Sequence, residues 1–369
     1  MRILLTGGGT AGHINPAIAI AEIIKQNERR AEIAFVGTPN GMEARLVREA
    51  GYPMYPVKVR GFARSLSPRN LITLYYALTS PRAAKRILAD FRPDAVIGTG
   101  GYVSWPVLSA AAACGIPCAL HESNALPGLT VRRLAPKMDA VWLNFAESAA
   151  HPALAGAHTV HTGNPLRRGF FTLARGEARA ALGLAEEELL FLSFGGSRGA
   201  ERINEVCLAA GEEILRRFPH MRHIHACGRA HFDACTARYP SESKRLVRLP
   251  YIENMPLYMA AADILLTRAG AMTVSELALC GKCAILVPSP YVADNHQYKN
   301  AALLAKAEAA VLLAENDLCT DTLLSALCEL AKDPELRRKY EKNIRVFSSP
   351  DADRILWGEI RALLRKNRR

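Results

Sequence analysis

The sequence contains two glycine-rich loops, one near the start of each half, and each loop follows a short apolar run. The first loop spans residues 7–13 and follows residues 3–5, and the second spans residues 195–199 and follows residues 189–192. Each segment predicts a strand, a loop and then a helix. Glycines let the backbone turn tightly and approach an anion closely, and the N–H groups at the helix start favour negative charge. Two such units predict two nucleotide-binding domains that face one cleft.

Strand-like and helical segments alternate along the whole chain. Further apolar runs lie at residues 34–37, 95–98, 118–121 and 140–142 in the first half, and at residues 223–226, 264–266 and 284–287 in the second. This alternation is typical of a parallel sheet covered by helices on both faces. After the second loop, a single helical stripe joins Ile203, Cys207, Ala210, Ile214 and Phe218. We therefore predict the α/β class, and 369 residues suffice for two domains.

The start of the chain does not resemble a signal peptide. Its apolar run ends at Thr6, and no later apolar stretch approaches the roughly 18 residues that span a bilayer. The sequence thus predicts a cytoplasmic protein, in which nine cysteines are expected to be reduced. Cys280 and Cys283 have the spacing of a redox or zinc motif, but no second pair accompanies them, so we expect a structural role.

The formal charge of +12 indicates an anionic partner. The cations are not concentrated in one block, apart from the tail at residues 361–369, and no nucleic-acid-binding signature is present. We therefore expect a membrane surface or a phosphorylated substrate, and no nucleic acid.

Dinucleotide-dependent oxidoreductases are the commonest other class of proteins that contain a loop like the first one. Such enzymes usually carry an acidic residue at the end of the second strand, where it holds the adenosine ribose. Here the second strand, residues 34–38, has no acidic residue at its end, and Glu32 precedes it. The sequence therefore disfavours this class.

A third glycine turn, in residues 268–276, precedes a helix in the second half. Glu276 falls within the first two turns of this helix, where a carboxylate can accept both ribose hydroxyls while the helix start meets a diphosphate. The alternative is a plain helix start with a solvated Glu276. Residues 294–297, Asp-Asn-His-Gln, follow a strand end, where parallel-sheet folds bind ligands, and they suit a sugar; a surface loop is the alternative.

Seven segments occur in the order found in one protein family. They are residues 8–13, 98–106, 121–124, 163–167, 195–200, 270–276 and 294–297. Together they resemble glycosyltransferase family 28, in particular the N-acetylglucosaminyltransferases of peptidoglycan synthesis. The chain departs from the family at Ala11, where a third glycine is frequent, and at Ser123, Arg198 and Met272.

The resemblance implies a glycosyltransferase-B fold, with two Rossmann-like domains whose parallel sheets face a deep cleft. Residues 1–165 would bind acceptor and membrane, residues 166–345 would bind the UDP-sugar, and the helix at about 346–369 would pack back on the first domain. The implied reaction moves N-acetylglucosamine from UDP-N-acetylglucosamine to the 4-hydroxyl of the MurNAc-pentapeptide of lipid I. The reaction inverts the anomeric carbon and gives lipid II. Neighbouring cell-wall synthesis enzymes become candidate partners.

The resemblance also implies the donor-site residues. The Ile252 backbone would meet the uracil, Glu276 the ribose and Gln297 the sugar. The diphosphate would be bound by Ser197 and by the helix start, which consists of Ala271, Met272, Thr273, Val274 and Ser275. The remaining donor contacts would come from Thr10, Ala11, Gly12, Asn124 and Arg167.

The reaction chemistry suggests which residues act directly. The acceptor hydroxyl must lose its proton, and the departing diphosphate must be stabilised, which donors at helix starts can do without a metal. We therefore expect no metal and no cofactor; Asp351 and Asp353 mimic a metal-binding pair but match a helix start. His13 is the preferred base because imidazole titrates near neutral pH. A helix-capping role for His13, and Glu122 or His121 as the base, remain alternatives.

An apolar stripe surrounded by cations suggests how the chain reaches a lipid acceptor. The stripe consists of Leu71, Ile72, Leu74, Tyr75 and Leu78, together with Tyr76, and the cations are Arg60, Arg64, Arg69, Arg82, Lys85 and Arg86. Such a helix can lie on an anionic bilayer, which predicts a peripheral protein on the cytoplasmic face of the inner membrane. A helix packed into the core is the alternative.

Three other functions fit parts of the sequence. A UDP-sugar epimerase of the same fold would need no acceptor, a related lipid glycosyltransferase would use diacylglycerol, and a nucleotide-sugar sensor would bind without turnover.

Overall fold

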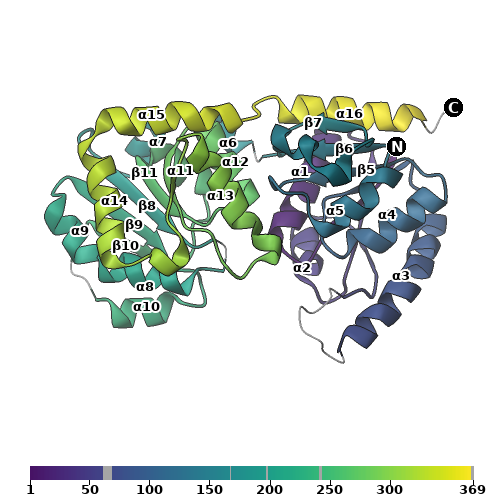
Figure 1. Cartoon of the computed structure of the whole chain (residues 1–369), viewed down its shortest axis with the longest axis horizontal. Coiled ribbons are helices and arrows are strands. Elements are labelled where there is room, and N and C mark those ends of the chain that lie inside the picture. The colour runs from purple at the N-terminus through teal and green to yellow at the C-terminus, as the bar shows by residue number, and fades with distance from the viewer. Residues whose placement is uncertain (61–68, 167, 197, 241–242, 367–369) are drawn as a thin grey trace. The chain divides into compact units, whose positions relative to one another are not determined.

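The computed structural model of the chain describes residues 1–60, 69–166, 168–196, 198–240 and 243–366. The chain divides into two compact units, Met1–Leu166 with Ser349–Arg369, and Arg167–Ser348. Each unit is built on one parallel sheet flanked by helices (Figure 1). This architecture confirms the predicted α/β class.

The first unit contains a 7-stranded sheet in the order β3-β2-β1-β4-β5-β6-β7. Its strands are β1 Arg2–Thr6, β2 Glu32–Gly37, β3 Met54–Pro56, β4 Ala95–Gly98, β5 Cys118–Glu122, β6 Ala140–Leu143 and β7 Thr159–His161. Its helices are α1 Ala11–Asn27, α2 Met42–Glu49, α3 Arg69–Phe91, α4 Ser104–Ala113, α5 Leu129–Leu134 and α16 Ala352–Lys366, with 3-10 turns η1 Ala135–Lys137, η2 Ala146–Ala150 and η3 Pro152–Leu154.

The second unit contains a 6-stranded sheet in the order β10-β9-β8-β11-β12-β13. Its strands are β8 Leu189–Phe194, β9 Met221–Ala226, β10 Leu246–Leu249, β11 Ile264–Thr267, β12 Cys283–Leu286 and β13 Val311–Leu312. Its helices are α6 Gly169–Thr172, α7 Arg175–Ala181, α8 Glu201–Ala209, α9 Gly211–Arg217, α10 Phe232–Arg238, α11 Met255–Ala261, α12 Ala271–Cys280, α13 His296–Lys306, α14 Thr320–Lys332 and α15 Pro334–Ile344, with η4 Ala293–Asn295, η5 Glu315–Asp317 and η6 Arg345–Phe347.

The first sheet buries both of its faces. Leu4 packs with α3, α4 and α5, whereas its neighbours Ile3 and Leu5 pack with α1, α2 and α16. Successive side chains of a strand point to opposite faces, so a run that is apolar at every position requires this double burial. The C-terminal helix α16 joins the second of these clusters through Leu356, Ile360 and Leu363. These three share one helical face, which explains why the chain returns to the first unit.

The strand order predicts where each unit binds a ligand. We call the carboxyl edge of each sheet, at the point where the strand order reverses, the ligand edge. In the first sheet β1 lies between β2 and β4, and in the second β8 lies between β9 and β11. Ligands of open parallel sheets bind where the order reverses, beyond the carboxyl ends of the strands. In both units a glycine loop lies at this point, after Thr6 in one and after Phe194 in the other.

The predicted single helix after the second loop is divided into α8 and α9 at Ala210. Gly211 is the first residue of α9. A Cβ atom added there would lie 2.9 Å from the Leu246 side chain, so α9 packs closely against β10 at this point. The apolar stripe nevertheless continues across the break, since Ile203, Cys207 and Ile214 share one core cluster. The interpretation of the stripe as core-facing is confirmed for these residues.

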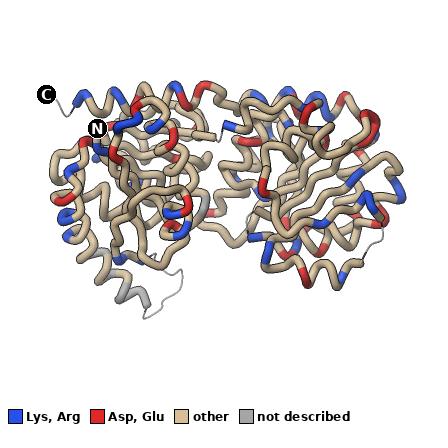
Figure 2. The backbone as a smooth tube through the Cα atoms, turned by 180° about the vertical axis from the view of Figure 1, so that it is seen from behind, with Lys and Arg blue, Asp and Glu red and all other residues tan. Residues whose placement is uncertain are grey.

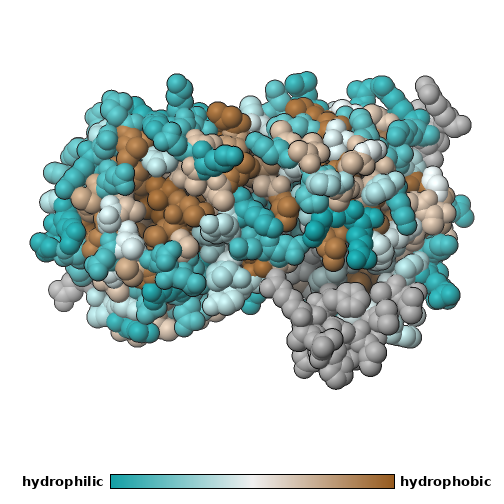
Figure 3. All heavy atoms as spheres, in the orientation of Figure 1, coloured by the Kyte–Doolittle hydropathy of each residue, from teal (hydrophilic) through white to brown (hydrophobic). Residues whose placement is uncertain are grey.

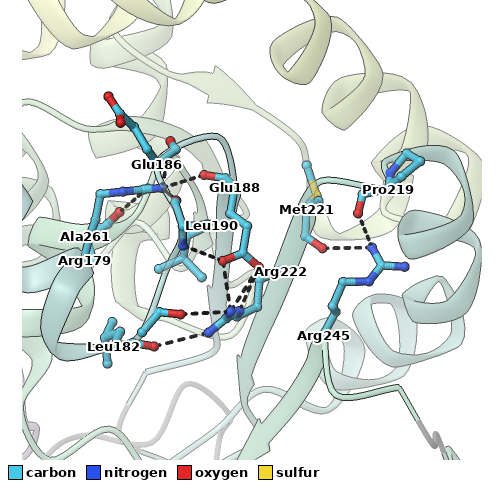
Figure 4. Close-up of polar contacts among 12 residues, drawn as sticks. Arg179, Leu182, Glu186, Glu188, Leu190, Pro219, Met221, Arg222, Arg245 and Ala261 are labelled. Carbon is cyan, nitrogen blue, oxygen red and sulfur yellow. Dashed lines mark hydrogen bonds and ion pairs between the residues drawn. The ribbon is translucent and has the colours of Figure 1, made fainter.

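Arginines stabilise the amino-terminal edge of the second sheet, opposite the ligand edge (Figure 4). Arg179 donates to the carbonyl of Glu188 at 2.7 Å, and Arg245 donates to the carbonyls of Pro219 and Met221 at 2.9 and 3.2 Å. Arg222 pairs with the Glu188 carboxylate at 2.9 Å. Part of the positive charge that suggested an anionic partner therefore serves folding.

The surface mixes charges of both signs. Lys and Arg are spread over both units and interspersed with Asp and Glu (Figure 2). Hydrophilic residues cover most of the outline of each unit, and hydrophobic residues gather on part of the visible face of the second (Figure 3). In the part of the chain that the structure describes, no helix is both long and apolar enough to cross a membrane.

Candidate functional site

The first glycine loop packs directly on the loop that follows β4. A Cβ atom added to Gly101 would lie 2.2 Å from the carbonyl oxygen of Gly8, so the two backbones are in contact. Gly101 has a φ of 78°, which residues with side chains rarely adopt. The two loops therefore form one close-packed backbone surface at the ligand edge, and α1 begins on it at Ala11.

His13 is held in the first turn of α1. Its Nδ1 atom lies 3.2 Å from the Thr10 hydroxyl, and the Thr99 hydroxyl donates to the His13 carbonyl at 2.6 Å. A Cβ atom on Gly100 would lie 2.8 Å from the imidazole Cδ2, so the ring rests against the loop after β4. The half-buried imidazole is therefore oriented by its neighbours at the ligand edge.

Glu43 is a buried carboxylate beneath the first glycine loop that the sequence analysis missed. Its Oε1 atom accepts bonds from the backbone N–H and the hydroxyl of Thr38 at 3.0 and 2.5 Å. Its Oε2 atom accepts the Gly9 N–H at 3.4 Å, and the side chain is 1% exposed. The available signal was an acid in the first turn of an amphipathic helix, but such acids usually face solvent.

Glu122 ends β5 and organises the loop that follows it. Its Oε1 atom accepts both the backbone N–H and the side-chain amide of Asn124, at 2.9 and 3.0 Å, and its Oε2 atom accepts the Gly128 N–H at 2.7 Å. Burial raises the pKa of Glu122, and these hydrogen bonds oppose the rise. The carboxylate thereby holds Asn124 in place. The neighbouring His121 is fully buried, its Nε2 is 3.0 Å from the Gly163 carbonyl, and burial lowers its pKa to about 4.

The second glycine loop is tightly packed where the structure describes it. A Cβ atom on Gly195 would lie 2.3 Å from the Ala200 nitrogen. Gly199 has a φ of 78°, and a Cβ atom there would lie 2.2 Å from the Cys227 carbonyl oxygen. This loop therefore requires glycine at both positions, and α8 starts immediately beyond it at Glu201.

Helix α12 begins at the same edge, and its N-cap residue makes no side-chain capping hydrogen bond. Gly270 occupies the N-cap position, and none of the described residues of the first turn is acidic. An N-terminus of this kind favours an anion through its N–H groups and dipole. Glu276 lies half-buried further along the helix. Asn300 of α13 donates to the Ala269 carbonyl at 3.1 Å, which ties the next helix to this turn.

The polar segment before α13 has an unusual backbone. Asp294 and Asn295 have φ values of 50° and 51°, in the left-handed region that short polar residues tolerate. The Oε1 atom of Gln297 accepts the Ser289 N–H at 2.8 Å, which fixes the side chain against the loop after β12. His296 lies 2.8 Å from the Ala293 carbonyl, and burial lowers its pKa.

The structure groups the predicted site residues within each unit. Ile252 follows β10, and α12 and Gln297 follow β11 and β12, so all of them lie at the carboxyl edge of the second sheet. Thr10, Gly12, His13, Glu122 and Asn124 lie at the corresponding edge of the first. Ser197 and Arg167 lie outside the described residues, as do the side chains of Ala11, Leu71, Ile72, Leu74 and Leu78.

The cysteines and acids considered as metal ligands have structural surroundings. Cys280 ends α12 and Cys283 begins β12, and all nine cysteines are free thiols. Asp353 lies in the first turn of α16, and burial raises its pKa. Among the described residues, no group of three or more His, Cys, Asp or Glu side chains could hold a metal ion.

Comparison with known proteins decides the family. Residues 3–143 match the N-terminal domain of glycosyltransferase family 28, and residues 191–354 match its C-terminal domain. The chain is 41% identical over 348 residues to a protein of Ruminiclostridium cellulolyticum, in an alignment that covers 93% of this chain and 94% of the relative. The chain belongs to glycosyltransferase family 28. The relative is named "UDP-N-acetylglucosamine--N-acetylmuramyl-(pentapeptide) pyrophosphoryl-undecaprenol N-acetylglucosamine transferase".

Solved structures show the same fold. The crystal structure of Acinetobacter baumannii MurG matches with a TM-score of 0.79 and 29% identity, over 98% of this chain and 99% of that one. A UDP-GlcNAc 2-epimerase from Neisseria meningitidis, bound to UDP-GlcNAc, matches with a TM-score of 0.66 at 14% identity, over 98% and 99% of the two chains. The fold is therefore the predicted glycosyltransferase-B fold. Because an epimerase shares it, the fold alone does not separate transferases from epimerases.

Proposed function

We propose that this protein transfers N-acetylglucosamine from UDP-N-acetylglucosamine to the 4-hydroxyl of the MurNAc-pentapeptide of lipid I, forming lipid II. The similarity to the Ruminiclostridium cellulolyticum transferase, over 93% of the chain, is the observation that carries this proposal. The position of α12, Glu276 and Gln297 at one sheet edge supports it.

The second unit binds the donor. The start of α12, from Ala271 to Ser275, meets the diphosphate through its N–H groups, since the N–H groups and dipole of a helix N-terminus favour an anion. Glu276 accepts hydrogen bonds from the ribose hydroxyls, the backbone at Ile252 meets the uracil, and Gln297 meets the sugar. Ser197 and Arg167 belong to the proposed donor site but lie outside the described residues. The first unit contributes Thr10, Ala11, Gly12 and Asn124 to substrate binding.

The chemistry is a single displacement with inversion. His13 accepts the proton of the acceptor hydroxyl as the oxygen bonds to the anomeric carbon, and the bond from that carbon to the diphosphate oxygen breaks. The start of α12 stabilises the charge on the departing UDP. Glu122 acts through Asn124, because its carboxylate oxygens already accept three N–H bonds from the loop.

A transfer assay tests the function. Labelled N-acetylglucosamine is supplied as its UDP donor with a lipid I analogue and a chelator, and the N-acetylgalactosamine donor serves as control. Selective transfer in the presence of chelator is the expected result. Release of an epimerised sugar nucleotide without acceptor, or transfer only to diacylglycerol, would contradict the proposal.

The first half of α3 is proposed to contact the anionic membrane at the cytoplasmic face. Tyr75 is 62% exposed, and its ring lies 5.8 Å from that of Tyr76. Arg82, Lys85 and Arg86 are exposed further along the helix. In the second half of the helix, where these cations lie, Ala84 and Leu88 pack into the core, so the inner face there anchors α3 while the cations line its outer face. The proposed acceptor carries a long lipid, and this surface would bring the enzyme to it.

Replacing Leu74 and Tyr75 together by glutamate is expected to weaken binding to phosphatidylglycerol vesicles by at least about tenfold, because two apolar side chains become charged. Vesicle co-sedimentation measures the effect. Tyr291, which is 83% exposed in the second unit, supplies the matched control, and Tyr291→Glu should leave vesicle binding unchanged. Undiminished binding by the double variant would contradict the membrane surface.

A further inference from the structure

A chain of buried polar side chains lies beneath the second glycine loop. Ser193 belongs to β8, His223 and His225 to β9, and Asn204 to α8, and each is at most 3% exposed. The Ser193 hydroxyl lies 2.7 Å from both His223 Nε2 and His225 Nδ1. His225 Nε2 lies 3.0 Å from Asn204 Oδ1. We call this chain, from Ser193 through His225 to Asn204, the relay.

Only one assignment of donors and acceptors is consistent with all the hydrogen bonds of the relay. The relay ends on the Cys227 carbonyl, which can only accept, and the Asn204 amide donates to it at 2.9 Å. The oxygen of that amide, Oδ1, must then accept a hydrogen bond from the N–H group at His225 Nε2. The other ring nitrogen, His225 Nδ1, therefore carries no hydrogen and accepts a hydrogen bond from the Ser193 hydroxyl.

The same reasoning assigns His223. Because the Ser193 hydroxyl donates to His225, its oxygen accepts from His223 Nε2, and both rings carry their proton on Nε2. Burial lowers the pKa of both histidines, that of His225 to about 3, so both rings are neutral at physiological pH. His223 stacks on Phe191 with ring centroids 4.5 Å apart, and its buried Nδ1 has no hydrogen-bond partner among the described residues.

The relay touches the elements that hold the glycine loop. Ser193 lies two residues before Gly195, and Asn204 lies in the first turns of the helix that follows the loop. The Cys227 carbonyl oxygen, which accepts the hydrogen bond from Asn204, also contacts Gly199. A Cβ atom added to Gly199 would lie 2.2 Å from this oxygen. The next residue, Gly228, packs on the same stretch, with an added Cβ 2.7 Å from the Gly199 Cα. One hydrogen-bonded chain thus joins the strand before the loop, the helix after it and the turn beneath it.

A buried polar group without a hydrogen-bond partner costs free energy. An arrangement of the strands that broke the hydrogen bonds of the relay would therefore be disfavoured. Ser193 and His225 are neighbours in the β8–β9 pairing, so a one-residue shift of either strand would break the relay. The hydrogen bonds therefore specify one register and one backbone position for the described loop residues.

We propose that the relay positions Gly195 and Gly199 and the Cys227–Gly228 turn for binding the nucleoside diphosphate of the donor. This inference rests on the proposed function, in which the second unit binds UDP-N-acetylglucosamine and Ser197 of this loop belongs to the donor site. Ser193, His225 and Asn204 are positioning residues and do not touch the substrate.

Calorimetric titration of the full-length protein with UDP tests the relay. Ser193→Ala breaks it with little change of volume, and the Kd for UDP should rise roughly fivefold to tenfold, the factor expected from one lost hydrogen bond. The KM for the UDP-sugar should rise similarly, while kcat and the KM for the acceptor change less than about twofold. Ser193→Thr keeps the hydroxyl and should restore UDP affinity.

A stability control separates positioning from general weakening. Leu330, in the core-facing stripe of α14, is 1% exposed and lies in the same unit, outside the relay. Leu330→Ala should lower the stability of the unit and leave the Kd for UDP unchanged. If Ser193→Ala left the Kd unchanged, or if Leu330→Ala raised it equally, the relay would not position the loop.

Nitrogen-15 NMR of the histidine rings tests the hydrogen-bond direction independently of activity. His225 is expected as the neutral Nε2–H tautomer in the wild type, assigned by loss of its signal in His225→Asn. The Nδ1–H tautomer would overturn the relay. Failure of the wild type to bind UDP would instead overturn the proposed function, and with it the role of the relay in donor binding.

Discussion

Replacing His13 by alanine is expected to reduce kcat by about 10²–10⁴-fold, while the KM for the UDP-sugar changes less than about threefold. General base catalysis contributes a factor of this size. His13 is held by the Thr10 hydroxyl and by the loop after β4, at the ligand edge of the first unit, whereas the donor helix α12 belongs to the second. Steady-state kinetics with both substrates separate the two parameters.

A second histidine of the first unit supplies the control for this prediction. His158 is exposed before β7, and His158→Ala should leave kcat within about twofold. An unchanged kcat in His13→Ala would remove His13 from the mechanism and leave a helix-capping role. In that case Glu122 would be the next base to test, although the N–H bonds that it accepts favour a positioning role.

Replacing Asp263 by alanine is expected to destabilise the second unit by about 3–5 kcal/mol, since it leaves a buried guanidinium without its counter-charge. Asp263 Oδ2 accepts from Arg179 at 3.1 Å and from the Leu190 N–H at 2.7 Å, and Oδ1 pairs with Arg175. Arg179 and Asp263 are 8% and 5% exposed. Figure 4 shows how Arg179 also reaches the carbonyls that precede β8, so the loss would loosen the start of the sheet.

Urea unfolding of the second unit measures the loss. Glu253, which pairs with Arg229 at the surface, supplies the matched control, with side chains 74% and 68% exposed. Glu253→Ala should change the free energy of unfolding by less than about 1 kcal/mol, because exposed ion pairs contribute little. An equal loss of unfolding free energy in both variants would show that the buried ion pairs of Asp263 stabilise the unit no more than an exposed ion pair does.

The central strands and the glycine loops could be predicted because their signals are local. Each central strand is an apolar run that both faces of a sheet bury, and each loop shows its glycines directly. The edge strands β3, β7, β10 and β13 were not predicted. Each pairs with one neighbouring strand only, and its extended conformation depends on that pairing, which no local pattern reveals.

The polar residues behind the loops could not be predicted for a different reason. His223 and His225 lie in a strand-like run, and neither residue alone indicates a partner. Their bonds to Ser193 and Asn204 depend on the register of β8 with β9 and on the packing of α8. Glu43 is similar, since Gly9 lies 34 residues away from it along the chain.

The sequence by itself determined two parallel α/β units, glycine loops at the carboxyl ends of their first strands, and membership of glycosyltransferase family 28. These properties follow from apolar runs, glycine positions and ordered motifs that lie within short segments. Only the tertiary structure decided which polar groups are buried and what satisfies them. It placed Glu122 against Asn124 and Gly128, Glu43 beneath Gly9, and the relay beneath Gly199. The physical reason is that burial depends on which elements pack together, and packing brings donors and acceptors from distant parts of the chain within hydrogen-bonding distance.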